Sequence, residues 1–378
     1  MIKKILFFLI LILLFSGFCC RAENTLNDMY NEQLEASGAE QLWESLPQST
    51  RDLLDGIGIN GLNADSFTQM QPQSISNSLI ELVKQRASGP FGVAGVLMGV
   101  VLLYALMDGM RQTVREESVS KIFGTVCAIA ACASLVIPVS HCIHTVSDAA
   151  RSISVFMISF VPVYAGVMLA SGQVVGAAGF QSIVLFASEL ISLAATHLIV
   201  PLMTVSMALG LTGAVTPEMK LDAAGGLINK CCGWFMALAT TVFTGLLAIK
   251  ELVGGAADTV TGRAVKFSLG TFVPIVGGAL GEAYSSVSAC LSLLKSTLGA
   301  FGVLATVVIV LPPLIECIMW VLCLSFCSMT AEIFSLDTVA SLFKSAQGVL
   351  KTLIGVLMSC SMFMVVATTI VTLLGRNV

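Results

Sequence analysis

Long apolar runs constrain this chain more than any other feature of its sequence. Runs of about 18 or more apolar residues recur from Phe91 to the C-terminus, and about 20 such residues let a helix cross roughly 30 Å of hydrocarbon. Lipid offers the backbone no hydrogen-bond partners, so these runs must be helical. A transmembrane barrel would show segments of alternating polarity, and no such alternation is visible. We therefore predict an all-α, polytopic membrane protein.

The overall composition agrees with this fold class. The chain of 378 residues is 56% hydrophobic and only 11% charged, whereas soluble domains carry about 45–50% apolar and about 25% charged residues. A water-covered protein of this size would need more polar surface than the sequence supplies. The composition therefore excludes an ordinary soluble enzyme.

About eight membrane spans are expected in the region 91–378, several of them kinked or broken at proline or glycine. We place them near residues 91–107, 122–140, 153–171, 182–211, 231–249, 267–281, 300–323 and 352–374. The sixth is short and contains Pro274, so it is a span, a re-entrant segment or one half of a broken helix. Proline removes a helical hydrogen bond, and its recurrence favours either kinked helices that shape a pore or simple packing kinks.

The N-terminal part of the chain has a different character. Residues 1–22 combine two lysines, an apolar stretch and a small-residue cleavage site, which predicts a signal peptide; an uncleaved first span is the alternative. Residues 23–90 hold ten acidic against three basic residues, which argues against nucleic acid as a partner. We expect this segment to be extracytoplasmic and to form short helices. One of these is predicted to start with a capping box at Ser49 and Asp52 and to end near Gly56 to Gly58.

Three ionisable residues within the apolar runs are candidates for a functional role: Glu189, His197 and Glu316. Such residues are costly in a bilayer and usually face protein or water. Glu316 either lines a polar pathway or forms a hydrogen bond between helices. Glu189 lies about two helical turns before His197, so the two could share an aqueous cavity.

Enzyme, metal and cofactor signatures are missing from the sequence. It contains no P-loop, no H-E-x-x-H, no G-x-S-x-G and no G-x-G-x-x-G. His141 and His144 could share a helix face with Asp148, but no second ligand pair accompanies them. Ser171 and His197 lie on neighbouring predicted spans, yet nothing positions them for catalysis. We therefore predict no catalytic residue, no metal site and no cofactor.

One stretch of sequence carries a family resemblance. The block from Asp258 to Gly278 (DTVTGRAVKFSLGTFVPIVGG) resembles the most characteristic segment of stage III sporulation protein AE. Three further segments are similar to the same family: Leu291 to Lys295, Leu311-Pro312-Pro313 and Phe160-Val-Pro-Val163. The likeness runs from about residue 91 to the C-terminus. The positions of the block that we single out are Asp258, Gly262, Arg263, Lys266, Pro274, Gly277 and Gly278.

The resemblance implies a role in endospore formation. Members of this family are expected to be non-enzymatic membrane subunits of a secretion-like feeding channel between mother cell and forespore. Their expected partners are sibling stage III sporulation membrane proteins, a forespore-side membrane protein and the lipid bilayer. The expected location is the mother-cell-derived outer forespore membrane, with the N-terminal segment extracytoplasmic. Two alternatives remain open at this point, a stand-alone secondary transporter and a membrane scaffold without its own conduit.

Overall fold

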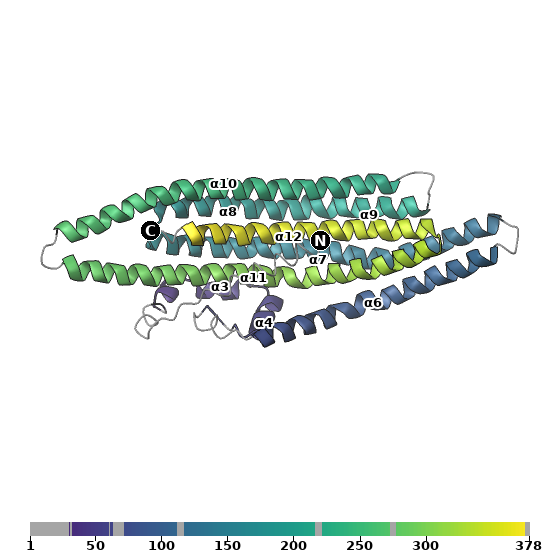
Figure 1. Ribbon diagram of the computed structural model, residues 1–378, viewed down its shortest axis with the longest axis horizontal. Coiled ribbons are helices and arrows are strands. Elements are labelled where there is room, and N and C mark those ends of the chain that lie inside the picture. The colour runs from purple at the N-terminus through teal and green to yellow at the C-terminus, as the bar shows by residue number, and fades with distance from the viewer. Residues whose placement is uncertain are drawn as a thin grey trace.

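The protein is an elongated bundle of antiparallel helices, seen here in a computed structural model (Figure 1). The structure describes residues 30, 32–59, 61–62, 72–111, 117–215, 221–272 and 277–374; the predicted signal peptide, residues 1–22, lies outside them. Every regular element in the described part is helical, so the predicted all-α membrane fold is confirmed. The elements are α3 (Glu40–Glu44), α4 (Gln48–Gly56), α6 (Pro72–Arg111), α7 (Glu117–Ala170), α8 (Val174–Leu193), the π-helix η1 (Ala194–Ile199), α9 (Val200–Val215), α10 (Leu221–Phe272), α11 (Gly277–Ile333) and α12 (Asp337–Leu374).

Within the described residues, six helical segments are long and apolar enough to cross a membrane, which is roughly consistent with the eight or so spans expected. The expected spans 122–140 and 153–171 are joined in the single helix α7. The polar residues between them contain no glycine or proline after Pro138, so nothing stops the helix there. The expected span 267–281 covers the end of α10, residues outside the described part and the start of α11. The joining of the two spans in α7 has a physical cause, since polarity alone does not end a helix.

Most of the prolines are accommodated without a break. α7 continues through Pro138 and Pro162, and α11 continues through Pro312 and Pro313. The clearest departure from α-helix geometry is η1, which ends two residues before Pro201. Proline has no N–H and its ring crowds the carbonyl four residues earlier, and a π-turn relieves that conflict. The expectation of helices altered at proline is therefore met at Pro201 by a local change of helix type.

The N-terminal acidic segment packs along the side of the bundle. Trp43 of this segment lies 6.4 Å, centroid to centroid, from Phe301 of α11. The buried Tyr30 hydroxyl donates a hydrogen bond to the carbonyl of Leu62 at 3.0 Å, and burial raises the Tyr30 pKa to about 12. The boundary drawn at residue 90 falls inside α6, which runs unbroken from Pro72 to Arg111.

The predicted capping box at Ser49 is wrong, because α4 begins at Gln48 and Pro47 occupies the cap position without a side-chain hydrogen bond. A proline already has a φ angle that suits the start of a helix. The predicted end of the helix is confirmed. α4 ends at Gly56, and Gly58 takes a φ of 90°, which a glycine adopts without strain.

α11 and α12 form the centre of the bundle, and α6 and α10 lie at its outside. Of the most apolar window of each helix, 61% is buried in α11 and α12 but only 17% in α6 and α10. Phe156, Phe160 and Tyr164 of α7 stack against one another, with ring centroids 5.5 and 5.4 Å apart, and Phe301 of α11 completes this aromatic layer. The interior is therefore filled with side chains at this level.

The helices are long compared with a membrane. α7, α10 and α11 have 54, 52 and 57 residues, and at about 1.5 Å per residue each measures roughly 80 Å. A bilayer core is about 30 Å thick. Exposed apolar side chains occur in widely separated parts of this length, as Leu106 on α6, Phe186 on α8 and Val253 on α10 show.

Candidate functional site

Asp258, the first residue of the family-like block, caps a different helix from its own. Its carboxylate oxygens accept hydrogen bonds from the backbone N–H groups of Val175 at 3.0 Å and Gly176 at 2.9 Å. These two residues lie in the first turn of α8, and the first N–H groups of a helix have no partner within it. The positive end of the helix dipole also favours a carboxylate there. Asp258 is 2% exposed, so this contact is made out of reach of solvent.

The turn before α8 explains why the cap comes from α10. α7 ends at Ala170, and Gly172 takes a φ of 84°, which reverses the chain. Gln173 holds the cap position of α8 but makes no side-chain cap bond. Its side-chain oxygen instead accepts a hydrogen bond from Lys295 Nζ of α11 at 2.6 Å. The orphan N–H groups of α8 are thereby left to Asp258.

A second carboxylate, that of Glu251, lies on α10 seven residues before Asp258. The Lys295 ammonium is near enough to attract both carboxylates. Glu251 is 4% exposed, and its Oε1 has no hydrogen-bond partner among the described residues. We call the group formed by Gln173, Glu251, Asp258, Lys295 and the N–H groups of Val175 and Gly176 the polar clamp. It joins α8, α10 and α11.

Two glycines allow this close contact. A Cβ atom on Gly254 would lie 3.1 Å from the Gly176 nitrogen and 3.2 Å from its Cα atom. A Cβ atom on Gly176 would in turn lie 3.3 Å from Asp258 Oδ2 and 3.4 Å from Glu251 Oε2. Both positions are thus restricted to the smallest residue if the α8 backbone is to approach α10.

The structure says less about the other six positions singled out in the family-like block. Gly262, Arg263 and Lys266 lie in the last part of α10, and Gly277 and Gly278 begin α11, but their side chains are outside the described part. Pro274 lies outside the described residues. Of the seven positions singled out in the block, Asp258 is the one whose side-chain contacts the structure describes, and it belongs to the polar clamp.

Glu316 joins three helices. Its Oε2 accepts a charged hydrogen bond from Arg86 of α6 at 3.0 Å, and its Oε1 lies 3.8 Å from His141 Nε2 of α7. The Glu316 side chain is 10% exposed, against 38% for Arg86 and 62% for His141. The structure thus shows Glu316 in a contact between helices, and its role in a polar pathway stays a prediction.

Because Glu316 is more buried than Arg86, we expect their substitutions to lower the stability of the protein by different amounts. Arg86→Gln should destabilise the protein more than Glu316→Gln, because it leaves a buried carboxylate without its cation, at a cost of about 1–3 kcal/mol. Glu316→Gln leaves an arginine that can turn to water. Thermal unfolding of the full-length chain in detergent measures the difference. Lys84→Gln, at an exposed position of the same helix, is the control. Equal losses for the two variants would contradict this account.

The aqueous cavity that the spacing of Glu189 and His197 suggested stays a prediction. Both are exposed, on α8 and η1 respectively. The π-helix between Ala194 and Ile199 adds residues to the turn and rotates His197 relative to Glu189. No ion pair or hydrogen bond links the two within the described chain. Their part in a pathway or in packing remains a prediction.

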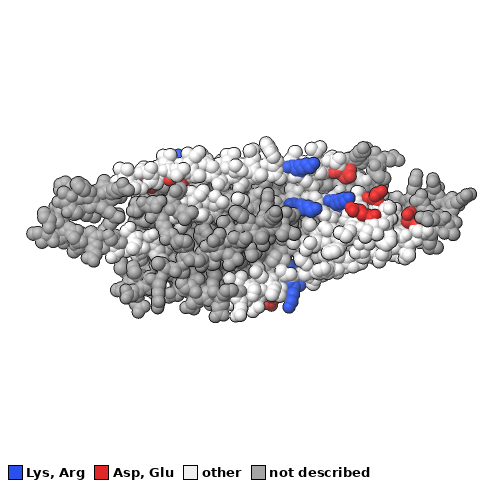
Figure 2. All heavy atoms as spheres, in the orientation of Figure 1, with Lys and Arg blue, Asp and Glu red and all other residues white. Residues whose placement is uncertain are grey.

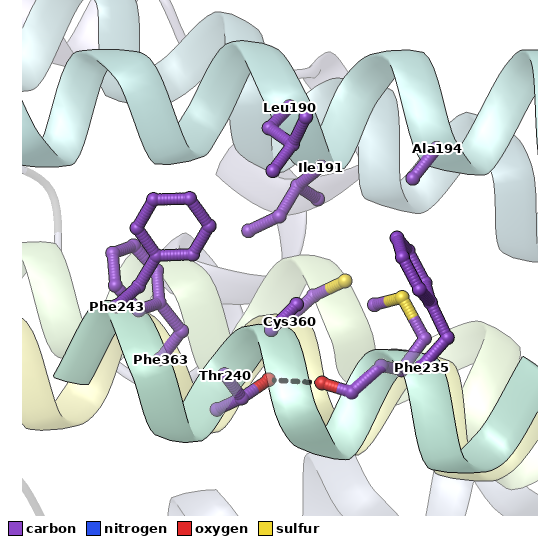
Figure 3. Close-up of a pocket in the computed structure, with 10 residues that line it drawn as sticks. Leu190, Ile191, Ala194, Phe235, Thr240, Phe243, Cys360 and Phe363 are labelled. Carbon is purple, nitrogen blue, oxygen red and sulfur yellow. Dashed lines mark hydrogen bonds between the residues drawn. The ribbon is translucent and has the colours of Figure 1, made fainter. Parts of the chain in front are cut away.

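The structure also contains a small apolar cleft between α8, α10 and α12 (Figure 3). Its lining includes Leu190, Phe235, Phe243, Cys360 and Phe363. The Thr240 hydroxyl on its wall donates to the Met236 carbonyl at 2.9 Å, so it is already satisfied. The cleft offers no charged group to a polar substrate.

Glu251, Gln173 and Arg86 were missed by sequence reasoning. Glu251 follows Lys250 at the end of an apolar run and has the look of an interfacial charge. The sequence feature that could have identified Glu251 was its spacing of seven residues from Asp258, which puts both carboxylates on one face of a helix. Nothing local marked Arg86, whose partner is 230 residues away.

Comparison with known proteins places these features in a family. The family model described as stage III sporulation protein AE matches residues 62–375. Stage III sporulation protein AE of Bacillus subtilis (strain 168) is 22% identical over 271 residues, which is 72% of this chain and 66% of that protein. The aligned part is thus slightly less than two thirds of that relative. No solved structure matches. Because the family model extends from residue 62 through α12 and includes the whole polar clamp, this chain belongs to the stage III sporulation protein AE family.

Proposed function

We propose that this protein is a non-enzymatic membrane subunit of the channel between mother cell and forespore, needed for endospore development after engulfment. Membership of the stage III sporulation protein AE family supports a role in sporulation. The proposed location is the mother-cell-derived outer forespore membrane, and the proposed partners are sibling stage III membrane proteins and a forespore-side membrane protein.

The observation that carries the proposal is the length of the bundle. Helices of roughly 80 Å still extend about 60 Å along the membrane normal at the largest usual tilt of about 40°. A bilayer core of about 30 Å therefore covers only part of them. Apolar side chains are exposed in widely separated parts of the bundle. The apolar surface that lipid does not cover needs a protein partner, which favours a subunit of a larger assembly.

The distribution of charge supports the same proposal. Figure 2 shows basic side chains gathered near the middle of the long axis on one face, with acidic side chains nearer one end. Lys344 and Glu332, for example, pair at 2.8 Å with side chains that are 62% and 47% exposed. Charges at these positions are costly in hydrocarbon, so a bundle immersed along its whole length is disfavoured.

A stand-alone secondary transporter is less well supported. Transporter sites are typically formed by discontinuous helices near the middle of the membrane. α11 is continuous through Pro312 and Pro313, where the sequence suggested a break. The cleft of Figure 3 has a nearly all-apolar lining. The unbroken helix and the apolar cleft favour the subunit over the transporter.

The test is deletion of the gene in its spore-forming host, with forespores scored after engulfment. We expect small, collapsing forespores and restored spores when the wild-type gene is returned. Affinity purification of the tagged, complementing protein from sporulating cells should recover sibling stage III proteins. Normal spores from the deletion strain would overturn the sporulation role. A purified chain that moves a substrate when reconstituted alone would replace the subunit with a transporter.

A further inference from the structure

The polar clamp contains one buried group whose bonding is incomplete. Glu251 is 4% exposed, and its Oε1 has no hydrogen-bond partner in the part of the chain that the structure describes. A buried ionised carboxylate without full partners is among the most costly groups in a protein. Native structures therefore supply the missing partner or remove the charge.

Three helices, α7, α10 and α11, contribute charged or titratable groups around Glu251. Asp258 faces it from α10, Lys295 from α11 and the Tyr164 hydroxyl from α7. Asp258 has the stronger need to stay ionised, because it accepts two backbone N–H groups at the positive end of α8. The Lys295 ammonium balances one negative charge. If Asp258 and Glu251 were both ionised, the Glu251 carboxylate would be a second negative charge without a positive charge to balance it.

We propose that Glu251 is a proton-binding residue, held as the neutral acid while the start of α8 is docked on α10. The bound proton brings the clamp to neutrality, with Asp258 negative and Lys295 positive. It also converts Glu251 from an acceptor alone into a group that has one O–H donor. This inference does not depend on the proposed channel, because all of its groups lie within this chain.

Release of the proton should loosen the clamp. Glu251 Oε2 lies beside Gly176, at 3.4 Å from the position of a Cβ atom there, and Gly254 brings the two backbones into contact at the same place. Ionisation transfers the proton from the carboxyl O–H to water or hydroxide and leaves two carboxylates at one joint. Their repulsion favours separation of the α8 start from α10. The clamp is therefore expected to weaken as the pH rises.

Infrared spectroscopy of the full-length protein in a detergent that contains no carbonyl group tests the proposal. The wild type should show the C=O stretching band of a protonated carboxylic acid at neutral pH and lose it as the pH rises. Glu251→Gln should lack this band, and Glu316→Gln should keep it as the matched control. Absence of the band from the wild type, or its persistence in Glu251→Gln, would overturn the proposal.

Thermal unfolding provides a second measurement. The melting temperature of the wild type should fall with rising pH, and that of Glu251→Gln should stay nearly constant, because glutamine copies the neutral acid. If Glu251 were instead ionised and paired with Lys295, Glu251→Gln would melt lower than the wild type at every pH above the acid range. That outcome would identify a permanent ion pair and exclude the proton site.

Discussion

Asp258→Asn is expected to destabilise the protein by about 1–3 kcal/mol, the usual cost of leaving a buried hydrogen-bond donor without its acceptor. The asparagine oxygen can replace one carboxylate oxygen, but its NH₂ group would face the second N–H group of α8. Lys295, which is 4% exposed, would lose the carboxylate that balances it. Loss of helical circular dichroism on heating the full-length chain in detergent measures the effect.

Asp222→Asn is the matched control for this substitution. Asp222 lies on the same helix but is exposed, and its carboxylate accepts a hydrogen bond from the neighbouring Ala223 N–H at 2.9 Å. We expect a change of no more than about 0.5 kcal/mol there. If Asp258→Asn and Asp222→Asn unfold together at the wild-type temperature, Asp258 does not hold α8 in place.

Gly302→Ala is expected to destabilise the bundle by about 1–3 kcal/mol, the usual penalty for overpacking a core. An added Cβ atom would lie 2.5 Å from Phe160 Cζ and 2.8 Å from Cε2. Phe160 is fully buried and stacks between Phe156 and Tyr164, so the ring has no free direction in which to retreat. Relief requires α7 and α11 to separate, which opens the aromatic layer.

Gly355→Ala on α12 separates this clash from the general effect of replacing a helical glycine. No atom lies within 4 Å of a Cβ atom at Gly355, and alanine favours a helix interior by up to about 1 kcal/mol. The control should therefore be neutral or stabilising in the same thermal assay. A Gly302→Ala protein as stable as the Gly355→Ala protein would show that the Phe160 layer is not tightly packed.

The position of the polar clamp gives the family-like block a structural role. Asp258 lies at the start of that block, where α10 contacts the start of α8 (Figure 1). Lys295 is placed on the returning helix α11. The clamp therefore holds both arms of the α10–α11 hairpin to the rest of the bundle, and a weakened clamp would free the hairpin first.

The sequence by itself determined the properties that depend on local composition. Apolar runs longer than a bilayer helix could only become helices, and the described residues of every expected span are helical. The end of α4 at Gly56 followed from glycines at which the chain turns. The family-like block pointed to Asp258 as a residue of interest. Each of these inferences uses residues that are neighbours along the chain.

Only the tertiary structure decided how these helices continue and what their polar residues contact. The expected loop at 141–152 became part of α7, because flanking packing against α8 and α11 extends a helix through a polar stretch that has no breaker. Asp258 meets Val175 across 83 residues and Glu316 meets Arg86 across 230. Such contacts leave no local pattern, since a carboxylate beside a lysine in sequence looks the same whether it is exposed or buried. Burial is set by the assembled helices, and it makes Glu251 and Lys295 parts of a site.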